Sequence, residues 1–279
     1  YTQPFGKGNT ARFAALLPMP AASVNGRWIL YGRALERYAG LKVFYASEGR
    51  ETGGDFEERV FESLLREALV RGIMRERRVF VSKEERRRIM EELRDQTQDG
   101  ETFEDEVRTA YGWSLREFER HVARPFAETK ALEEAILKDR ELQSEKRAKI
   151  DEAFEKLKDG AAFDGLVLEY SEDATSVFNG DVGWMDESSL PEAWRGPGLN
   201  LDVGETSPVL EERDRFVILR VDDREGFSGQ EISGGSGSAS EVSGSSRVNL
   251  SVLIVNKISL SLIIQTFAED SKMKVWVRL

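Results

Sequence analysis

The sequence contains no cysteine, and His121 is its only histidine. The lack of cysteine excludes disulfides, thiolate nucleophiles and cysteine metal sites. One histidine without cysteine cannot build a common zinc site, and the glycine-rich run lacks the lysine and following helix of a phosphate-binding loop. We therefore expect no metal and no cofactor. His121 stands among charged residues of a predicted helix, which favours a surface position over a Ser/His/Asp catalytic site.

Long apolar runs are also missing. No stretch of about 18 uncharged apolar residues occurs, so no segment of this sequence is expected to span a membrane. The chain starts at Tyr1 rather than methionine, and we expect a missing N-terminal piece that would hold any signal or membrane anchor. Its 279 residues, 40% hydrophobic and 33% charged, suit a globular protein of one or two domains.

Basic residues are outnumbered, and the net charge is −11. This balance argues against a nucleic-acid partner, because phosphate contacts need a basic face. Residues 1–50 carry seven Lys/Arg against two acidic residues, whereas residues 151–225 carry seven against twenty. Two modules of different charge are indicated, and the basic start would suit a position near an anionic membrane surface. The arginine-rich stretch 71–88 is interleaved with Glu, which predicts a solvated helix face.

Residues 55–140 have the pattern of a helical module. Apolar side chains recur at helical spacing from Phe56 to Ile73. Three helix starts are indicated by a hydroxyl residue followed three positions later by an acid, at Ser82/Glu85, Thr102/Asp105 and Ser114/Glu117. From Arg140 the helical pattern continues to Gly160, which supplies a stop.

After Gly160 the sequence becomes a small α/β pattern of short helices and glycine-punctuated strands. The Gly/Ser run 228–246 predicts a flexible linker, because it has no bulky side chains to pack. It is followed by RVNLSVLIVNK at 247–257, a strongly β-prone stretch. The last segment, 258–279, reads as a helix leading into an extended piece.

Five short motifs follow one another over about 65 residues: LKDGAAF (157–163), SED (171–173), GDVGW (180–184), GETSPV (204–209) and FVILRV (216–221). In this order and spacing they resemble the parvulin type of peptidyl-prolyl isomerase domain. That family reads Leu-x-x-Gly-x-x-Phe, Ser-Asp, Gly-Asp-Leu-Gly-aromatic, Gly-Glu-x-Ser-x-Pro-Val and Gly-Tyr-His-Ile-Ile. The resemblance implies a four-stranded antiparallel sheet with flanking helices.

One family element is absent from its usual place, because parvulins open with a strand and here the helical module runs directly into the first helix. LSVLIVNK, at the end of 247–257, matches that strand. The resemblance makes the first and last strands antiparallel neighbours, so we expect a natural circular permutation in which 247–257 pairs with 216–221. The linker costs little, since each doubling of loop length adds about 0.6 kcal/mol. The alternative is an isolated edge strand of the helical module.

Three segments of the first part carry a second resemblance: AASVNGRWI (21–29), VSKEERRRIM (81–90) and YGWSLREFERHV (111–122). They resemble the N-terminal chaperone region of SurA and related foldases, a helical cradle for unfolded client chains. In those proteins the segment after the isomerase domain packs back on the N-terminal helices, and the end of this chain is a candidate for that role.

Together the two resemblances imply an α+β protein. Residues 1–148 would form the SurA-like helical chaperone module, and 149–257 the parvulin-like domain with its linker and displaced strand. Residues 258–279 would form a C-terminal helix and extended segment that pack on the N-terminal module.

The parvulin resemblance also assigns site residues. Its proline pocket falls on Val182, Leu190 and Trp194, and its catalytic Cys or Asp falls on Asp173. Ordinary core packing for the apolar trio, and a cap or loop role for Asp173, are the competing interpretations.

The two family histidines become Val217 and Val252. Losing one histidine alone would leave a buried polar partner unsatisfied, at about 1 to 3 kcal/mol, whereas replacing both by valine can be nearly neutral.

We therefore expect an extracytoplasmic foldase or chaperone, periplasmic or at the cell surface and anchored through the missing N-terminal segment. It would bind unfolded or prolyl-containing polypeptides with a degenerate isomerase domain. Two alternatives stay open: an active isomerase that works without the histidines, and a non-catalytic assembly scaffold for one fixed partner. The sequence does not decide the oligomeric state.

Overall fold

The computed structural model describes residues 19–95, 102–226 and 246–276. The chain divides into two compact units, which we call the helical unit (1–136 with 260–279) and the sheet unit (137–259). In the described ranges, no helix has the length and apolarity needed to cross a bilayer.

The unit boundaries differ from those expected from the sequence. The expected boundary at 148/149 falls inside helix α8 (Ser144–Lys158), which lies wholly in the sheet unit. The sequence predicts one continuous helix through this region. The structure instead has a turn at residues 139–143, in which the Asp139 carboxylate accepts a hydrogen bond from the Leu142 N–H at 3.1 Å. All but Ser246 of the predicted linker lies outside the described residues.

The helical unit is built from helices and one small sheet. Its elements are β1 (Pro20–Val24), β2 (Arg27–Leu30), α2 (Tyr31–Ser47), α3 (Phe56–Glu76), α4 (Lys83–Arg94), α5 (Phe103–Tyr111), α6 (Leu115–Phe118), the π-helical turn η1 (Glu119–Ala123), most of α7 (Arg124–Lys138), α11 (Leu260–Asp270) and β7 (Met273–Val275). The sheet has the order β2-β1-β7. Residues of β1, β2, α2 and α3 share one apolar core, which includes Ala22, Ile29 and Leu64.

The three predicted helix starts are confirmed. The side chains of Ser82, Thr102 and Ser114 each accept a hydrogen bond from the backbone N–H three residues later. Glu117 completes a capping box by accepting from the Ser114 N–H at 2.8 Å. The hydrogen bond from the Ser114 hydroxyl lowers the pKa of Glu117, so this carboxylate stays charged where the helix end favours negative charge.

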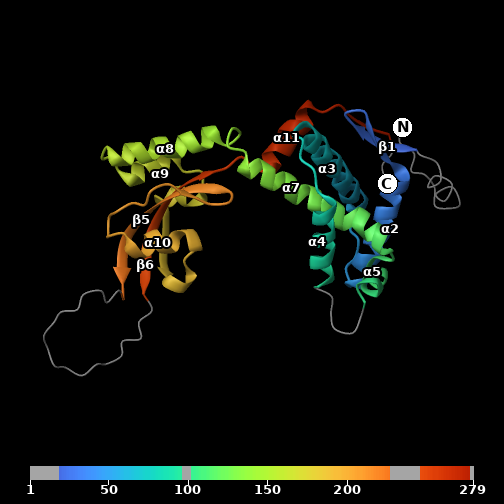
Figure 1. Ribbon diagram of the computed structural model, residues 1–279, viewed down its shortest axis with the longest axis horizontal. Coiled ribbons are helices and arrows are strands. Elements are labelled where there is room, and N and C mark those ends of the chain that lie inside the picture. The colour runs from blue at the N-terminus through green and yellow to red at the C-terminus, as the bar shows by residue number, and fades with distance from the viewer. Residues whose placement is uncertain (1–18, 96–101, 227–245, 277–279) are drawn as a thin grey trace, which may run out of the picture. The chain divides into compact units, whose positions relative to one another are not determined.

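The C-terminal segment lies against the N-terminal part of the helical unit. Strand β7 pairs antiparallel with β1, and α11 packs beside α3 (Figure 1). A Cβ atom at Gly72 would lie 2.7 Å from the Phe267 ring, so the missing side chain is what lets α11 approach α3 this closely.

The sheet unit combines helices with a four-stranded antiparallel sheet, the fold class that the sequence predicts. Its elements are α8, α9 (Phe163–Tyr170), the 3₁₀ turn η2 (Ala174–Phe178), β3 (Asp181–Asp186), the 3₁₀ turn η3 (Glu187–Ser189), α10 (Glu192–Asn200), β4 (Leu210–Glu211), β5 (Arg215–Glu225) and β6 (Arg247–Asn256). The strand order is β3-β6-β5-β4.

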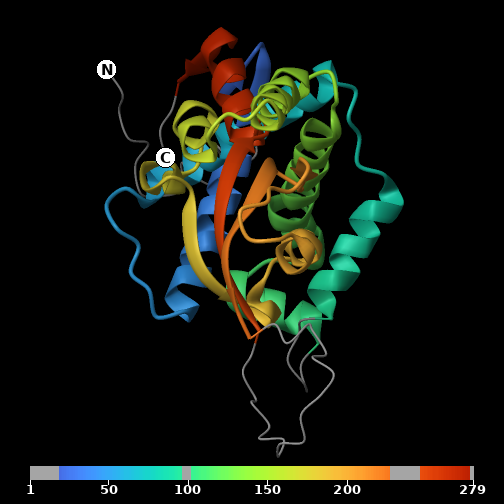
Figure 2. The ribbon, with the colours of Figure 1, turned by 90° about the vertical axis from the view of Figure 1, so that its left-hand side faces the viewer.

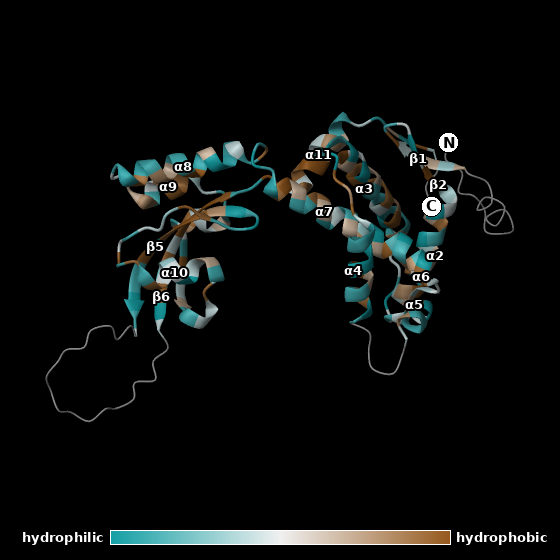
Figure 3. Cartoon of the chain, viewed as in Figure 1, coloured by the Kyte–Doolittle hydropathy of each residue, from teal (hydrophilic) through white to brown (hydrophobic). Residues whose placement is uncertain are grey.

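Strand β6, the displaced stretch of the sequence, lies between β3 and β5 (Figure 2). Its register with β5 runs from Arg215 opposite Asn256 to Glu225 opposite Arg247. Both strands are strongly apolar (Figure 3), because side chains on both of their faces are covered. One face packs on α8 and α9, and the opposite face packs on α10. The α10 face carries the candidate site.

Candidate functional site

The five apolar site residues expected from the sequence converge in one cluster. Strand β3 supplies Val182, α10 and its approach supply Trp194 and Leu190, and the central strands supply Val217 and Val252. Leu190 is 3% exposed and Trp194 is 5% exposed, while both valines are fully buried. The structure thus brings together the residues that the sequence resemblance assigns to a pocket and the two valines, and they pack in one apolar cluster.

The strand register fixes how the two valines lie. Val217 pairs with Ile254, and Val252 pairs with Leu219. Val217 and Val252 are therefore diagonal neighbours on the same face of the sheet, a relation in which longer side chains can still touch. Valine offers no hydrogen-bond donor or acceptor, so neither position can hold or orient a proton.

Polar side chains fix Trp194 from one side. Its indole N–H donates to the Glu212 carboxylate, whose other oxygen accepts from the Arg215 Nε at 2.7 Å. The Arg215 guanidinium also lies 6.0 Å from the centre of the Trp194 ring. Glu212 and Arg215 were not among the expected site residues, although the charged stretch EERDR (211–215), which joins β4 to β5, could have indicated them. Both charges are already paired with each other, which holds the tryptophan in place.

Asp173 caps the turn η2. Its carboxylate accepts a hydrogen bond from the Thr175 N–H at 2.9 Å. That bond is the main cause that lowers the pKa of Asp173, and the positive charge of Arg215 lowers it further. The carboxyl group is therefore ionised at neutral pH and has no proton to donate.

Gly180 allows β6 to sit against the start of β3. Its φ is +82°, and a Cβ atom there would lie 2.2 Å from the carbonyl oxygen of Val252. Its own carbonyl accepts from the Val252 N–H at 2.9 Å. Glycine is required here because any side chain would both strain the backbone and displace β6.

His121 is not a surface residue, contrary to the expectation from its charged neighbours. It is 1% exposed, its Nε2–H donates to the Glu36 carboxylate at 2.9 Å, and its ring stacks on Trp113. The π-helical turn η1 explains the error, because a π turn holds more residues than an α turn and shifts the helical phase. Burial lowers the pKa of His121.

Comparison with known proteins matches part of the chain, including most of the sheet unit, to a family. Residues 122–225 match the family model of the PPIC-type PPIase domain. The chaperone SurA of Alcanivorax borkumensis is 34% identical over 83 residues, 30% of this chain and 19% of that protein. The foldase protein PrsA of Geobacillus kaustophilus is 31% identical over 91 residues, 32% of this chain and 30% of that protein. PrsA of Bacillus subtilis is 33% identical over 76 residues, 26% of each chain.

The chain therefore carries a parvulin-type domain and is similar to SurA-like foldases, as the sequence motifs predicted. The similarity spans less than a third of the length of these relatives. The family match ends at residue 225, so β6 lies beyond it although β6 is a central strand of the sheet.

Proposed function

We propose that this chain is a folding factor that binds unfolded polypeptide segments, and that its parvulin-like domain has little or no isomerase activity. One observation carries the proposal. Val217 and Val252, which the sequence resemblance aligns with the family's histidines, are fully buried in an apolar cluster with Leu190 and Trp194.

The chemistry of prolyl isomerisation explains why this observation matters. The barrier is about 18 to 20 kcal/mol, and a catalyst must bind the twisted amide more tightly than the planar one. Methyl groups at Val217 and Val252 supply no directed polar contact that could make this distinction. Asp173 is engaged as a cap, and Arg215 and Glu212 are engaged with each other. Among these described residues, the apolar cluster could contribute only by removing water from a prolyl ring.

Exposed apolar side chains support binding of unfolded segments. Val177 and Phe178 are adjacent on η2 and are 74% and 70% exposed, and Leu168 on α9 is 65% exposed. Such groups contact the apolar side chains that an unfolded chain exposes. The net charge of −11 keeps a protein with exposed apolar groups in solution.

The proposal includes unfolded or prolyl-containing polypeptides as partners and an extracytoplasmic location. The resemblance to SurA-like foldases supports both. The basic balance of residues 1–50 supports a position close to an anionic membrane surface.

The test pairs two assays on one sample of the chain: a protease-coupled prolyl isomerisation assay and suppression of aggregation of an unrelated unfolded client. We expect clear suppression with no acceleration of isomerisation. Acceleration would show instead that the domain catalyses without histidines. A specific stoichiometric complex with one partner, without suppression for unrelated clients, would point to an assembly scaffold.

Two variants sharpen the test for catalysis. Trp194→Ala would remove a buried ring and can unfold the sheet unit, so Trp194→Phe, which keeps an aromatic ring, is measured beside it. Asp173→Asn keeps the helix cap and removes the charge. A wild-type rate that survives Trp194→Ala in a folded chain, and also survives Asp173→Asn, does not come from this site, whereas Trp194→Phe should retain any rate that the pocket supplies.

A further inference from the structure

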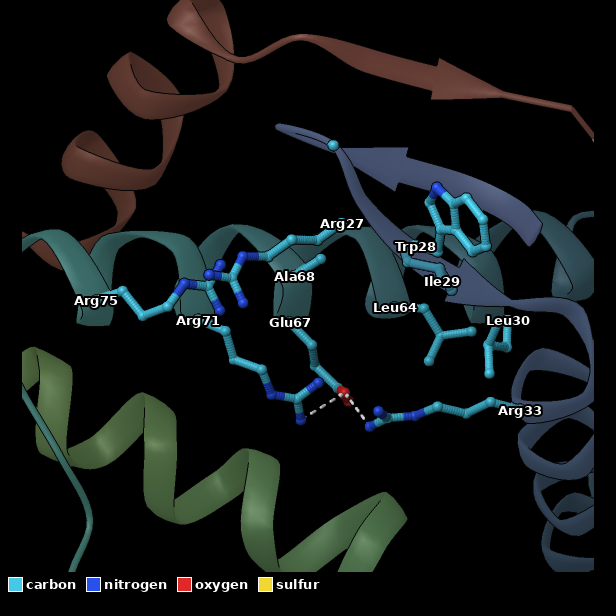
Figure 4. A pocket seen from close by; sticks show the side chains of 11 residues that line it. Arg27, Trp28, Ile29, Leu30, Arg33, Leu64, Glu67, Ala68, Arg71 and Arg75 are labelled. Carbon is cyan, nitrogen blue, oxygen red and sulfur yellow. Dashed lines mark hydrogen bonds and ion pairs between the residues drawn. The ribbon is translucent and has the colours of Figure 1, made fainter. Parts of the chain in front are cut away.

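The helical unit contains a pocket that the parvulin resemblance does not involve. Its volume is about 510 Å³, and it lies between α3, β2 and the start of α2. Four arginines line it: Arg27 from β2, Arg33 from α2, and Arg71 and Arg75 from α3. Figure 4 shows the guanidinium groups of Arg27 and Arg75 beside one another, and those of Arg33 and Arg71 directed at Glu67. We call this site the arginine pocket.

The residues that line the pocket include one carboxylate, that of Glu67. Glu67 accepts from Arg33 at 3.2 Å and from Arg71 at 3.4 Å (Figure 4), and it also accepts from Arg37 outside the pocket. Arg71 has a second carboxylate partner, Glu128, at 2.7 Å. The single carboxylate in the pocket is thus shared among three guanidinium groups.

Arg27 and Arg75 add two further positive charges to the pocket. Within the part of the chain that the structure describes, neither has an ion-pair partner, and the Nε–H of Arg33 is buried without a hydrogen-bond partner. Burial and then the charge of Arg27 lower the pKa of Arg75, while burial and then the charge of Arg71 lower that of Arg33. Because arginine stays protonated in proteins, these like charges repel one another, and an added anion would relieve that repulsion.

An apolar wall and a strand edge lie next to these cations. Trp28 is 64% exposed and Leu30 is 40% exposed, and both line the pocket together with Leu64. They belong to β2, which is an outer strand of the sheet β2-β1-β7 that the structure describes. An outer strand can pair with an extended peptide through its main chain.

We propose that the arginine pocket binds a carboxylate of an extended polypeptide client, with an apolar side chain of the client next to Trp28. Arginine pairs with carboxylates through two parallel hydrogen bonds, which suits two guanidinium groups that lack a partner. The strand edge and the exposed tryptophan favour a peptide over a lipid or a free phosphate, which need neither. This inference rests on the proposed function and specifies which client segments are preferred.

The test measures binding of an octapeptide with an uncharged fluorescent label to the full chain by anisotropy. The probe contains one Asp beside one Phe and has a free C-terminus. Two matched peptides separate the sources of carboxylate: one carries Asn in place of Asp, and the other has an amidated C-terminus. A third, the neutral peptide, carries both changes. We expect at least one of these replacements to weaken binding about tenfold, as loss of a charged hydrogen-bonding partner does.

The protein variant is Arg27→Gln with Arg75→Gln, because neither side chain supports Glu67. The matched control is Arg66→Gln with Arg116→Gln, which removes the same charge from two exposed positions outside the pocket. We expect the pocket variant to lose about tenfold in affinity for the acidic probe and to match wild type for the neutral peptide. The control should bind both peptides as the wild-type chain does. Trp28→Ala should weaken binding of the probe, but not of a matched peptide that carries Ala in place of Phe.

Three outcomes would overturn the inference: equal binding of acidic and neutral peptides, equal losses in the pocket and control variants, or displacement of the probe by equimolar inorganic phosphate or by vesicles of anionic lipid. Suppression of client aggregation is measured on the same proteins. If suppression persists while the acidic preference is absent, the proposed function stands and the arginine pocket is not a client site. If suppression is absent in the wild-type chain, the proposed function itself fails.

Discussion

Replacing Val217 by histidine should destabilise the sheet unit strongly. The position is fully buried in an apolar cluster, so the new ring nitrogens would have no partner, which costs about 1 to 3 kcal/mol. The ring is also larger than the valine side chain, and overpacking of a filled core costs about another 1 to 3 kcal/mol. Val252→His should behave alike, because its surroundings are the same cluster.

The double variant should lose less than the sum of the two single variants. Val217 and Val252 are diagonal neighbours on one face of the sheet, and two imidazoles in this relation can hydrogen-bond to each other. Contacting residues show coupling energies of about 0.5 to 3 kcal/mol, and we expect at least about 1 kcal/mol here because each ring satisfies a nitrogen of the other.

The coupling is measured by urea denaturation of the wild type, both single variants and the double variant. Amide hydrogen exchange in β5 and β6 reports the sheet unit apart from the helical unit. Additive losses would refute the idea that these positions support each other, and a single variant as stable as wild type would refute the description of the site as a filled apolar core. The double variant is also assayed for prolyl isomerisation, where a gain over wild type would tie the missing rate to the missing histidines.

Three further expectations concern single residues. Burial lowers the pKa of His121 below its ordinary 6.5, so on acidification the unfolded chain binds a proton before the folded chain does. The free energy of unfolding should therefore fall as the pH drops from about 7.5 to 5.5. An NMR titration that places the pKa of His121 at or above its ordinary value would contradict this expectation. Gly180→Ala should lower the free energy of unfolding by about 2 kcal/mol or more, through backbone strain and the clash with Val252. Gly183 has a similar φ of +75° but open space around a Cβ atom, so Gly183→Ala should cost about 1 kcal/mol. Equal losses of stability in thermal melts would show that the close approach of Gly180 to Val252 does not matter. Asp173→Ala should lose about 0.5 to 2 kcal/mol as a lost cap and Asp173→Asn much less; an isomerisation rate that falls in both variants without a change in melting temperature would assign the carboxylate to catalysis instead.

Local sequence signals predicted much of the fold. Helix caps such as Ser114 depend on side chains three residues apart, and they are visible in the sequence. The central strand β6 could be predicted because a β-prone stretch follows the parvulin motifs, while the first strand of the parvulin pattern is absent from its usual place. The same pattern selected five apolar residues that the structure places in one cluster.

Other features depend on contacts that sequence spacing does not show. The π turn η1 moved His121 inward because it breaks the helical period on which the surface prediction relied. The sequence of 71–88 predicts a solvated helix face, yet Arg71 is half-buried and donates hydrogen bonds to the carboxylates of Glu67 and Glu128. The arginine pocket was also missed, because its cations come from three separate elements that only the tertiary fold brings together.

The proposed loss of isomerase activity and the proposed binding of unfolded segments have different physical requirements. Catalysis needs interactions that strengthen as the amide twists, and the filled apolar cluster around Val217 and Val252 offers none that depend on the twist. Leu190 and Trp194 are nearly inaccessible, so a prolyl ring could enter only by opening packing that stabilises the sheet. Binding needs only accessible and complementary groups, and these lie elsewhere, at exposed apolar residues such as Phe178 and in the arginine pocket. A chain built this way can lose isomerisation without losing its clients.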